Sequence, residues 1–531
     1  SGGIVASDCA MPDSPENNFC TWNPLSASAS QGAVKTLSEG NLQFSGGAFG
    51  VVGGTMSVTS GKWYWETKLL STVDGSNPFV IGFVSANTIA HASSHDQSVV
   101  MYSDNGTGKL IQHIENSSVT QNITIPDALL TFDVNDVFQF AYDGDTGKIW
   151  VGKNNTYVAN DGGTDGNPSN GSNQTFTLAD TTIPMTPLAD HGGVAWTGLA
   201  NFGQLTNAYT APTDFNPLST ANLPEPTIGP NSTSQADNHF DTVLYTGNSG
   251  NKTISGLGFQ PDWVWAKSRS LAQNHHIHDS SRGVELRLNA EANNAEISDG
   301  ELKTFTSDGF TFDTAGATNT DGATNVAWCW HANSGTATAT ISESGNNPAA
   351  SVQANPTAGF SIITYTGTGA VGTIAHGLGV APTWMLIKNR DQADSWAVYH
   401  GGGYGVSDPQ TDYFILDTDV AVADSAAWWN DTTPTSSVFT VATDHAVNAD
   451  GEKYVAYVFA PVRGYSQIGS YQANSSSTAT PNHQGTFIYL GFRPAWVLIK
   501  QTGANAWNLH DNKRATINPM QAFLRPATNG A

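Results

Sequence analysis

The chain has 531 residues, with 21 Lys and Arg against 45 Asp and Glu, so its formal net charge is −24 although only 12% of its residues are charged. Such a chain has no general attraction for nucleic-acid phosphates or for an anionic membrane surface, and its 39% hydrophobic content is too rich for a disordered chain. It lacks any run of about 18 apolar residues that could span a bilayer, and its three cysteines cannot form a dense disulfide framework.

The N-terminus begins with Ser1 and shows neither an initiator Met nor the basic and apolar regions of a secretion signal. We expect either a processed chain or a fragment. Cys9 and Cys20 either pair across a short loop or remain separate thiols. Cys329, which stands between two tryptophans, is expected in a core.

Residues 40–204 alternate short apolar and aromatic runs with Gly, Asn, Asp and Pro, which is the pattern of an all-β domain. Residues 137–142 place aromatic side chains on one face of a strand, residues 143–147 supply a turn, and residues 148–151 return. We therefore predict a hairpin. The turn begins like a calcium loop, but Asn154 stands where that loop needs a glutamate, so a plain turn is favoured.

A loop of Gly, Asn, Asp and Ser residues follows at 160–173. Its oxygen-bearing side chains make Asp161, Asp165 and Asn167 candidate ligand-binding residues. Calcium is one open alternative there, and a solvated loop tip is another.

Prolines crowd the segment between Ala211 and Pro230. Proline removes ladder donors and stiffens a chain, so this composition indicates a domain exit. We predict a β-sandwich domain over 1–211 and a Pro-rich linker over 212–236.

Beyond this point the sequence repeats itself three times. Each repeat carries Gly-x-x-Pro, a Trp two residues after the proline, and a Lys four residues after the Trp. The prolines are 121 and 112 residues apart, and the tryptophans are Trp263, Trp384 and Trp496. The pattern predicts a turn feeding a strand that is buried on both faces. We predict tandem β units over 237–345, 346–463 and 464–531.

A closing segment ends the first two units, at 326–330 and 455–459. The third unit reaches Ala531 without one. We expect either a shortened third unit or a polypeptide that continues.

The only histidine cluster is His-His-Ile-His-Asp at 275–279. His276 and His278 would share one face of a strand, where a transition metal is one interpretation. The later units each carry a single histidine after the motif, His400 and His510, so a polar strand end is favoured.

Trp428 and Trp429 form an apolar pair beside polar residues. As an exposed platform they would stack on sugar rings, and we include them among the candidate ligand-binding residues. Packing in a core or between units is the favoured interpretation.

The first domain resembles the SPRY family. The resemblance rests on the order of five motifs: Gly-Lys-Trp-Tyr-Trp-Glu at 61–66, Ile-Gly-Phe at 81–83, Tyr-x-x-x-Gly at 102–106, the Asp-x-x-x-Gly-x-x-Trp hairpin at 143–150, and Asn-Phe-Gly-Gln at 201–204. It implies a bent β-sandwich that presents loops to protein or glycan ligands and has no catalytic machinery.

The opening segment 12–25 and the repeated Gly-Phe-x-Pro-Asp-Trp unit resemble virion fibre proteins of marine bacteriophages. That resemblance implies a structural protein on an extracellular particle, in a tail or fibre.

The expected fold is all-β and multi-domain, with an N-terminal SPRY-like sandwich followed by β-rich sandwich repeats. The expected function is a non-catalytic tail fibre or adhesin that touches a host surface glycan or protein. It would work as an oligomer, three copies by analogy with phage fibres, and its partners would be copies of itself and other virion proteins. We expect no catalytic residue, no metal, no cofactor, no nucleic acid and no membrane insertion. A purely architectural or capsid-decoration subunit is the alternative, and a capsule-degrading spike enzyme is less favoured.

Overall fold

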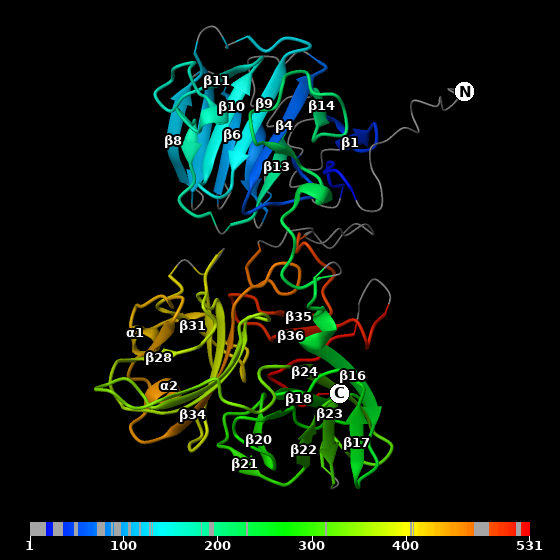
Figure 1. The fold of residues 1–531 in the computed structure, drawn as a ribbon, viewed down its shortest axis with the longest axis vertical. Helices are drawn as coiled ribbons and strands as arrows, with labels where there is room; N and C mark the ends of the chain where they lie inside the picture. The colour runs from blue at the N-terminus through cyan, green and yellow to red at the C-terminus, as the bar shows by residue number, and fades with distance from the viewer. Residues whose placement is uncertain are drawn as a thin grey trace. The chain divides into compact units, whose positions relative to one another are not determined.

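The computed structural model divides the chain into two compact units (Figure 1). The sandwich unit consists of Ser1–Pro224 with Ser470–Gly491, and the three-repeat unit consists of Glu225–Gly469 with Phe492–Ala531. The structure describes residues 17–24, 35–46, 51–71, 80–86, 89, 97–104, 108–115, 118–126, 129, 131–181, 183–190, 196–229, 232–313, 316–403, 406, 408–471, 488–516 and 522–530.

Two sheets make up the sandwich unit. The nine-stranded sheet has the order β1 (Lys35–Ser38), β2 (Gln43–Gly46), β14 (Thr197–Asn201), β4 (Lys62–Leu69), β9 (Val137–Asp143), β10 (Lys148–Lys153) and β11 (Thr156–Val158), with β12 (Phe176–Thr177) beside β10 and β15 (Asn216–Pro217) beside β4. The six-stranded sheet has the order β3 (Val51–Gly53), β13 (Met185–Asp190), β5 (Val80–Ser85), β6 (Gln97–Asp104), β7 (Gly108–Glu115) and β8 (Ser118–Thr124).

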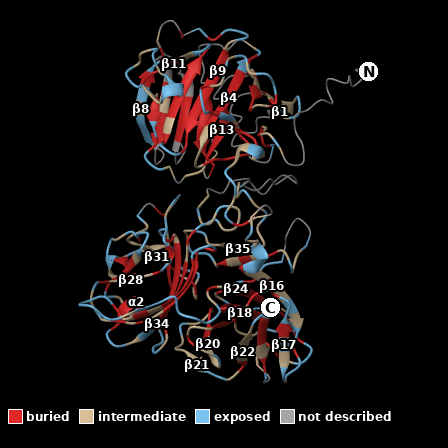
Figure 2. Cartoon of the chain, viewed as in Figure 1, coloured by how far each residue is buried: buried red, intermediate tan, exposed pale blue. Residues whose placement is uncertain are grey.

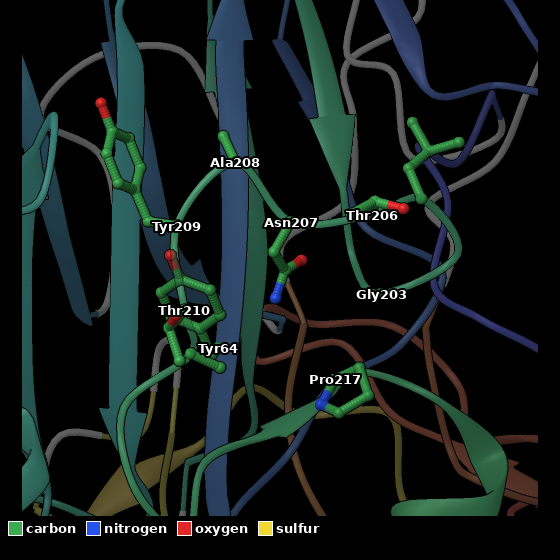
Figure 3. A pocket seen from close by; sticks show the side chains of 10 residues that line it. Tyr64, Gly203, Thr206, Asn207, Ala208, Tyr209, Thr210 and Pro217 are labelled. Carbon is green, nitrogen blue, oxygen red and sulfur yellow. The ribbon is translucent and has the colours of Figure 1, made fainter.

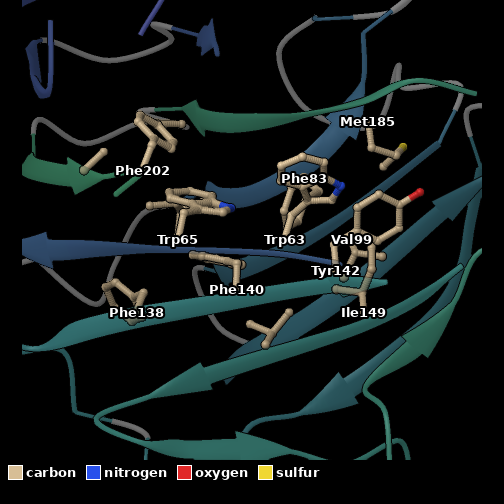
Figure 4. Packing of buried hydrophobic residues seen from close by; sticks show 14 of the residues in the cluster. Trp63, Trp65, Phe83, Val99, Phe138, Phe140, Tyr142, Ile149, Met185 and Phe202 are labelled. Carbon is tan, nitrogen blue, oxygen red and sulfur yellow. The ribbon is translucent and has the colours of Figure 1, made fainter. Parts of the chain in front are cut away.

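One hydrophobic core lies between these two sheets, which makes the unit a β-sandwich. Trp65 on β4 stacks on Phe140 of β9, with ring centroids 4.5 Å apart, and meets Phe83 of the opposite sheet edge-on at 6.0 Å (Figure 4). The aromatic residues of the SPRY-like motifs therefore hold the two sheets together.

The predicted hairpin over 137–151 is confirmed as β9 and β10, paired antiparallel. Asp143 Oδ1 accepts the backbone N–H groups of Asp145 and Thr146, and Gly147 adopts a positive φ of 71°. The segment that begins like a calcium loop is thus a turn closed by its own side chain.

The segment predicted as a linker over 212–236 begins inside the sandwich unit. Its strand β15 pairs with β4, and Phe215 and Leu218 are buried. The unit boundary lies between Pro224 and Glu225 instead. Prolines suit an edge strand as well as a linker, which is why composition alone placed the exit too early.

The first two repeats form separate sheets in the three-repeat unit. The first repeat has β16 (Phe240–Thr246), β24 (Thr324–Trp330), β18 (Trp263–Ser268), β19 (His276–Asp279), β20 (Leu286–Asn289) and β21 (Ile297–Ser298) in that order, and a second sheet of β17 (Lys252–Ser255), β23 (Gly309–Phe312) and β22 (Leu302–Thr306). The second repeat has β25 (Ala339–Ile341), β26 (Ala350–Asn355), β27 (Phe360–Thr366), β34 (Lys453–Phe459), β29 (Trp384–Asn389), β30 (Ala397–His400), β31 (Asp412–Ile415) and β32 (Ala423–Asp424), and a pair of β28 (Gly372–Ala375) and β33 (Val438–Val441).

The third repeat contributes β35 (Trp496–Ile499) and β36 (Asn508–Asp511). The three motif tryptophans begin equivalent strands, because β18, β29 and β35 each pair antiparallel with the next strand in the same register. The sequence repeat is therefore a structural repeat. We call these three the motif strands, and β24 and β34 the closing strands.

Both faces of the motif strands β18 and β29 are buried (Figure 2). On one face the first and second repeats each have a core of their own, which includes Val264 in the first repeat and Met385 in the second. On the other face the three repeats contribute to one shared core. Its members include Trp263, Trp328, Phe360, Trp384, Tyr457, Trp507 and Leu509.

The expectation of three tandem domains needs correction for this reason. The first two repeats do have private cores, but the shared core joins all three repeats into one compact unit. A sequence motif shows that a strand is buried on both faces and does not show what covers each face.

Two single-turn α-helices, α1 (Ala426–Trp429) and α2 (His445–Asn448), and three 3₁₀ turns, Pro168–Asn170, Thr220–Asn222 and Ala236–Asn238, complete the elements described. Among the residues described, no helix has the length and apolar character needed to cross a membrane. Cys20 and Cys329 are buried free thiols, whereas Cys9 lies outside the described residues.

Candidate functional site

A cavity of about 360 Å³ opens on the sandwich unit beside β4. Its wall is the segment that follows β14, and its lining residues are Tyr64, Gly203, Leu205, Thr206, Asn207, Ala208, Tyr209, Thr210, Ala211 and Pro217 (Figure 3). We call this cavity the β4 pocket. None of these lining residues carries a formal charge at neutral pH.

A buried carboxylate fixes the wall of the β4 pocket. Glu66, 3% exposed, accepts the backbone N–H of Ala208 at 2.7 Å and that of Tyr209 at 3.0 Å. It also accepts the hydroxyl of Tyr64 at 2.6 Å, and Gln139 donates to that hydroxyl oxygen at 2.9 Å. Burial raises the pKa of Tyr64, so the phenol stays protonated and remains a donor.

Glycine is required where the pocket wall meets β15. Gly203 has a φ of +120°, and a Cβ atom there would lie 2.1 Å from Cβ of Pro217. Only glycine permits this backbone conformation and this close approach together. The fold therefore fixes the position of the pocket wall against β15 without any ligand.

The polar groups of the pocket are amides and hydroxyls. The Asn207 side chain accepts a hydrogen bond from Asn201 Nδ2 at 2.8 Å, and its own NH₂ group donates to no described residue. In Figure 3 this side chain extends toward Pro217. Thr206 and Thr210 are exposed, and Tyr209 is partly exposed. A partly exposed aromatic ring beside neutral hydrogen-bonding groups suits an uncharged, hydroxyl-rich ligand.

The predicted ligand-binding loop at 160–173 is ordered by its own side chains. Asp161 Oδ1 accepts the N–H of Gly163 at 2.8 Å, and Asp165 Oδ2 accepts from Asn173 Nδ2 at 2.8 Å. Asn167 caps the turn that follows it. Asp161, Asp165 and Asn167 are all exposed and lie on this one loop, outside the lining of the β4 pocket. Ligand binding by these three residues stays a prediction.

Trp428 and Trp429 lie in a core, as the favoured interpretation of this pair predicts, and they form no exposed platform. The two indoles are only 6% and 1% exposed and belong to the private core of the second repeat. Trp428 stacks on Tyr413 with centroids 3.8 Å apart, and Trp429 Nε1 donates to the carbonyl of Asp412 at 3.1 Å. Flanking polar residues suggested exposure, but they form the ends of the one-turn helix α1.

The histidine cluster at 275–279 is buried on β19. His276 and His278 lie near Glu301, close enough for three ligand atoms to fall within 4.8 Å of one another. Arg287 Nη1, which can only donate, lies 2.9 Å from His276 Nε2, so that nitrogen accepts and Nδ1–H donates to Glu301 at 2.5 Å.

These contacts engage both nitrogens of His276 and set a guanidinium charge against its ring. His278 donates to the carbonyl of Leu286 at 3.0 Å, and burial lowers the pKa of this histidine to about 4. The hydrogen bonds and the guanidinium favour the polar strand interpretation over a cation site. His400 pairs with Trp384 as Asp279 pairs with Trp263, so His400 occupies the place of Asp279 and not that of His278.

Sequence reasoning missed the β4 pocket. The motif at 201–204 belongs to the SPRY-like order, but the polar stretch that follows it carries no pattern of its own. The one available signal was Glu66, an acidic residue inside an aromatic strand. A buried carboxylate in such a place needs several donors, and here these are the backbone groups of the wall.

Comparisons with known proteins give one family and several solved structures. The model of a family described as "Domain of unknown function (DUF7483)" matches residues 235–531, which is more than half of the chain. A search of curated proteins finds no match.

Among solved structures, the SPRY domain of human HERC1 is 14% identical, with a TM-score of 0.26, covering 35% of this chain and 99% of that one. The carbohydrate binding module CBM66 from Bacillus subtilis is 10% identical, with a TM-score of 0.22, covering 35% and 94%. The lectin from Bauhinia forficata in complex with GalNAc is 10% identical, with a TM-score of 0.20, covering 36% and 94%. At these TM-scores the matches carry no argument about ligand or function.

Proposed function

For this chain, which belongs to the family described as "Domain of unknown function (DUF7483)", we propose a non-catalytic adhesin whose sandwich unit binds an uncharged glycan in the β4 pocket. The observation that carries the proposal is the lining of that pocket, which has aromatic, amide and hydroxyl groups and no charged residue. Sugars are recognised by stacking on aromatic rings and by hydrogen bonds to their hydroxyls.

The net charge supports the same type of ligand. A chain with a charge of −24 is repelled by an acidic surface, and salt screens that repulsion beyond about 10 Å. Short-range hydrogen bonds and ring stacking remain effective under such conditions. The pocket supplies both kinds of contact.

The absence of catalysis belongs to the same proposal. Glycoside hydrolysis requires two carboxyl groups roughly 5 to 9.5 Å apart across the scissile bond. The carboxylate behind the pocket wall is Glu66, and its oxygens already accept from Ala208, Tyr209 and Tyr64. Engaged in this way, Glu66 serves to hold the wall.

The setting we propose for this adhesin is a bacteriophage particle, as part of a tail or fibre that also contacts other virion proteins. The support is the resemblance of the repeats and of segment 12–25 to virion fibre proteins. Single glycan contacts are weak, so several copies acting together would supply useful affinity. Immunogold labelling of purified particles would test this setting, and label confined to host debris would count against it.

The experiment for the pocket is a glycan array of neutral and acidic oligosaccharides, followed by titration calorimetry with the full chain. We expect neutral glycans to bind. Replacing Asn207 by Ala should weaken binding about fivefold, through the loss of one hydrogen bond, and Tyr209→Ala should weaken it about tenfold. Asn251→Ala, which changes an exposed amide of the three-repeat unit, is the matched control.

Two outcomes would contradict the proposal. Unchanged affinity in both pocket variants, with loss of binding in Asp161→Ala, would move the site to the 160–173 loop. Release of reducing sugar from a bound glycan would show that the protein is an enzyme.

A further inference from the structure

Two buried histidines lie where the first repeat meets the other two. His239 stands just before β16 and is 8% exposed, and His275 stands just before β19 and is fully buried. His239 contacts Asn355 on β26 of the second repeat, and His275 approaches the backbone of Arg525 in the third. Both histidines therefore belong to junctions between repeats.

The hydrogen bonds of His239 fix its protonation state. Asn355 Oδ1 accepts the backbone N–H of Ala358 at 3.1 Å, so the amide nitrogen of Asn355 is the atom that lies 3.0 Å from His239 Nδ1. An amide nitrogen can only donate, so Nδ1 carries a lone pair. The ring proton is on Nε2 and is donated to Ser234 Oγ at 2.6 Å. A second ring proton on Nδ1 would face an amide N–H.

The groups around His239 also disfavour a charge on its ring. Burial acts to lower the pKa of the neighbouring His331, but hydrogen bonds to Asp262 and Gln260 raise it, so this ring becomes charged first as the pH falls. The two rings lie 6.4 Å apart, and burial, together with His331, lowers the pKa of His239. Tyr465 also packs edge-on against His239, and burial raises its pKa, so the phenol stays neutral.

His275 is held neutral by an indole. Trp265 Nε1, which can only donate, lies 3.0 Å from His275 Nδ1, and both side chains are fully buried. Nδ1 therefore carries a lone pair, and the ring proton is on Nε2, which faces the backbone of Arg525. Protonation of Nδ1 would set two N–H groups against each other inside the core.

The surroundings of His275 are mostly basic. Burial lowers the pKa of His275 well below its usual value, and Lys267, His276 and Arg514 lower it further. The one carboxylate in contact is Glu291, whose Oε2 accepts the backbone N–H of His275 at 3.0 Å and so binds the main chain of this residue. A charged His275 ring has no counter-ion among these groups that bonds to it.

Both histidines contact the shared core. Trp265, the donor to His275, is one of its members. Trp330 is another, and its ring packs against Phe240, the residue after His239, with centroids 4.8 Å apart. A displacement at either histidine therefore reaches the side chains that join the repeats.

We propose that the three-repeat unit is an acid-operated switch, in which protonation of His239 and His275 parts the first repeat from the second and the third and opens the shared core. The open form takes up protons that the closed form excludes. The closed form has its full stability above the unfolded histidine pKa of about 6.5 and loses stability as the pH falls below that value.

Native-state hydrogen exchange of the full chain between pH 7.5 and pH 5.5 tests this proposal, at constant ionic strength and with rates corrected for intrinsic exchange at each pH. We expect the opening constant reported by β18, β24, β29 and β34 to rise at least tenfold over this interval, because each histidine that must stay neutral contributes up to about tenfold. The amides of β4 and β9 in the sandwich unit should not follow.

Asparagine variants identify the groups that take up the protons. An Asn side chain places Oδ1 near the position of the His Nδ1 atom, where it accepts a hydrogen bond and does not titrate. His275→Asn should remove about tenfold of the rise, and His239→Asn a smaller part, because its pKa is less depressed. His445→Asn, at an exposed histidine of the same unit, should keep the full rise. Other buried histidines add the same background to every variant.

Three results would overturn the proposal: an opening constant that does not change down to pH 5.5, the same rise in both Asn variants as in the wild type, or an equal response of β4 and β9, which would show acid unfolding of the whole chain. If His275→Asn misfolds, Trp265→Phe replaces it. That variant removes the donor to Nδ1, so the closed form can accept the proton and the rise should become smaller. An undiminished rise in Trp265→Phe would count against the switch.

Discussion

The contact between Tyr457 and Asp279 offers a direct test of how the repeats are held together. Replacing Tyr457 by Phe removes one hydroxyl and leaves the ring in place. That ring stacks on Trp263 with centroids 4.5 Å apart, and Tyr457 is fully buried. The variant therefore isolates the hydrogen bond from the packing.

The expected cost follows from the state of the acceptor. Asp279 is fully buried, and after the change its carboxylate still accepts from Nε and the backbone N–H of Arg282. A hydrogen bond to a charged group contributes roughly 1.5–3 kcal/mol. Because Arg282 continues to compensate the charge, we expect the free energy of unfolding to fall by about 2 kcal/mol. This corresponds to about a 30-fold rise in the equilibrium constant for opening of the unit.

Native-state hydrogen exchange of the β18 and β19 amides measures this constant in the full chain. Tyr413→Phe is the matched control, since the structure assigns its hydroxyl no hydrogen bond to a described residue and its stacking on Trp428 would remain. Asp279→Asn combined with Tyr457→Phe should cost less than the sum of the two single changes. A Tyr457→Phe variant as stable as the control would refute the idea that this bond links two repeats.

Three other changes have defined outcomes. Trp384→Ala, at a residue 7% exposed between β34 and β30, should destabilise the three-repeat unit by about 3–5 kcal/mol, measured by calorimetry, and an unchanged transition would show that the indole packs poorly. Burial acts to raise the pKa of Glu301, but the hydrogen bonds that its carboxylate accepts from His276 and Thr318, with further electrostatic contacts, lower it to about 2. Stability from this group is thus present above its unfolded pKa near 4.3 and should be lost as pH falls toward 2, and Glu301→Gln should flatten that part of a pH–stability curve. Gly203→Ala should cost about 1–3 kcal/mol in thermal unfolding of the sandwich unit and weaken glycan binding, whereas full retention of both would show that the pocket wall can shift.

The sequence predicted the all-β fold, the 137–151 hairpin and the equivalence of the motif strands, because each depends on local patterns. Alternating aromatic residues, a turn rich in Asp and Gly, and a proline at a fixed distance from a tryptophan all act within a few residues. The structure confirms these predictions in the pairing of β9 with β10 and in the register of β18, β29 and β35.

The features that the sequence left open or did not reveal depend on contacts far apart in the chain. Burial of Trp428 and Trp429 is set by partners such as Tyr399 and Tyr413 that local composition does not reveal. The β4 pocket arises because Glu66 binds the backbone of residues 208 and 209, more than 140 positions away. The shared core was hidden for the same reason, since a strand apolar on both faces can belong to one domain or to several.

The hydrogen bond between Trp328 and Asp511 spans 183 positions of the sequence, so it cannot form until long after Trp328 has been synthesised. At about 5–20 residues per second, a ribosome needs roughly 10–40 s to reach Asp511 after it has added Trp328. The private core of the first repeat consists of residues between Ile254 and Cys329 and can close during that interval. The indoles on the opposite face of the first repeat's sheet belong to the shared core and cannot be buried in that interval. The nascent chain therefore exposes hydrophobic surface until synthesis is nearly finished. Molecular chaperones that bind exposed hydrophobic surface should therefore raise the yield of folded protein without changing its free energy of unfolding.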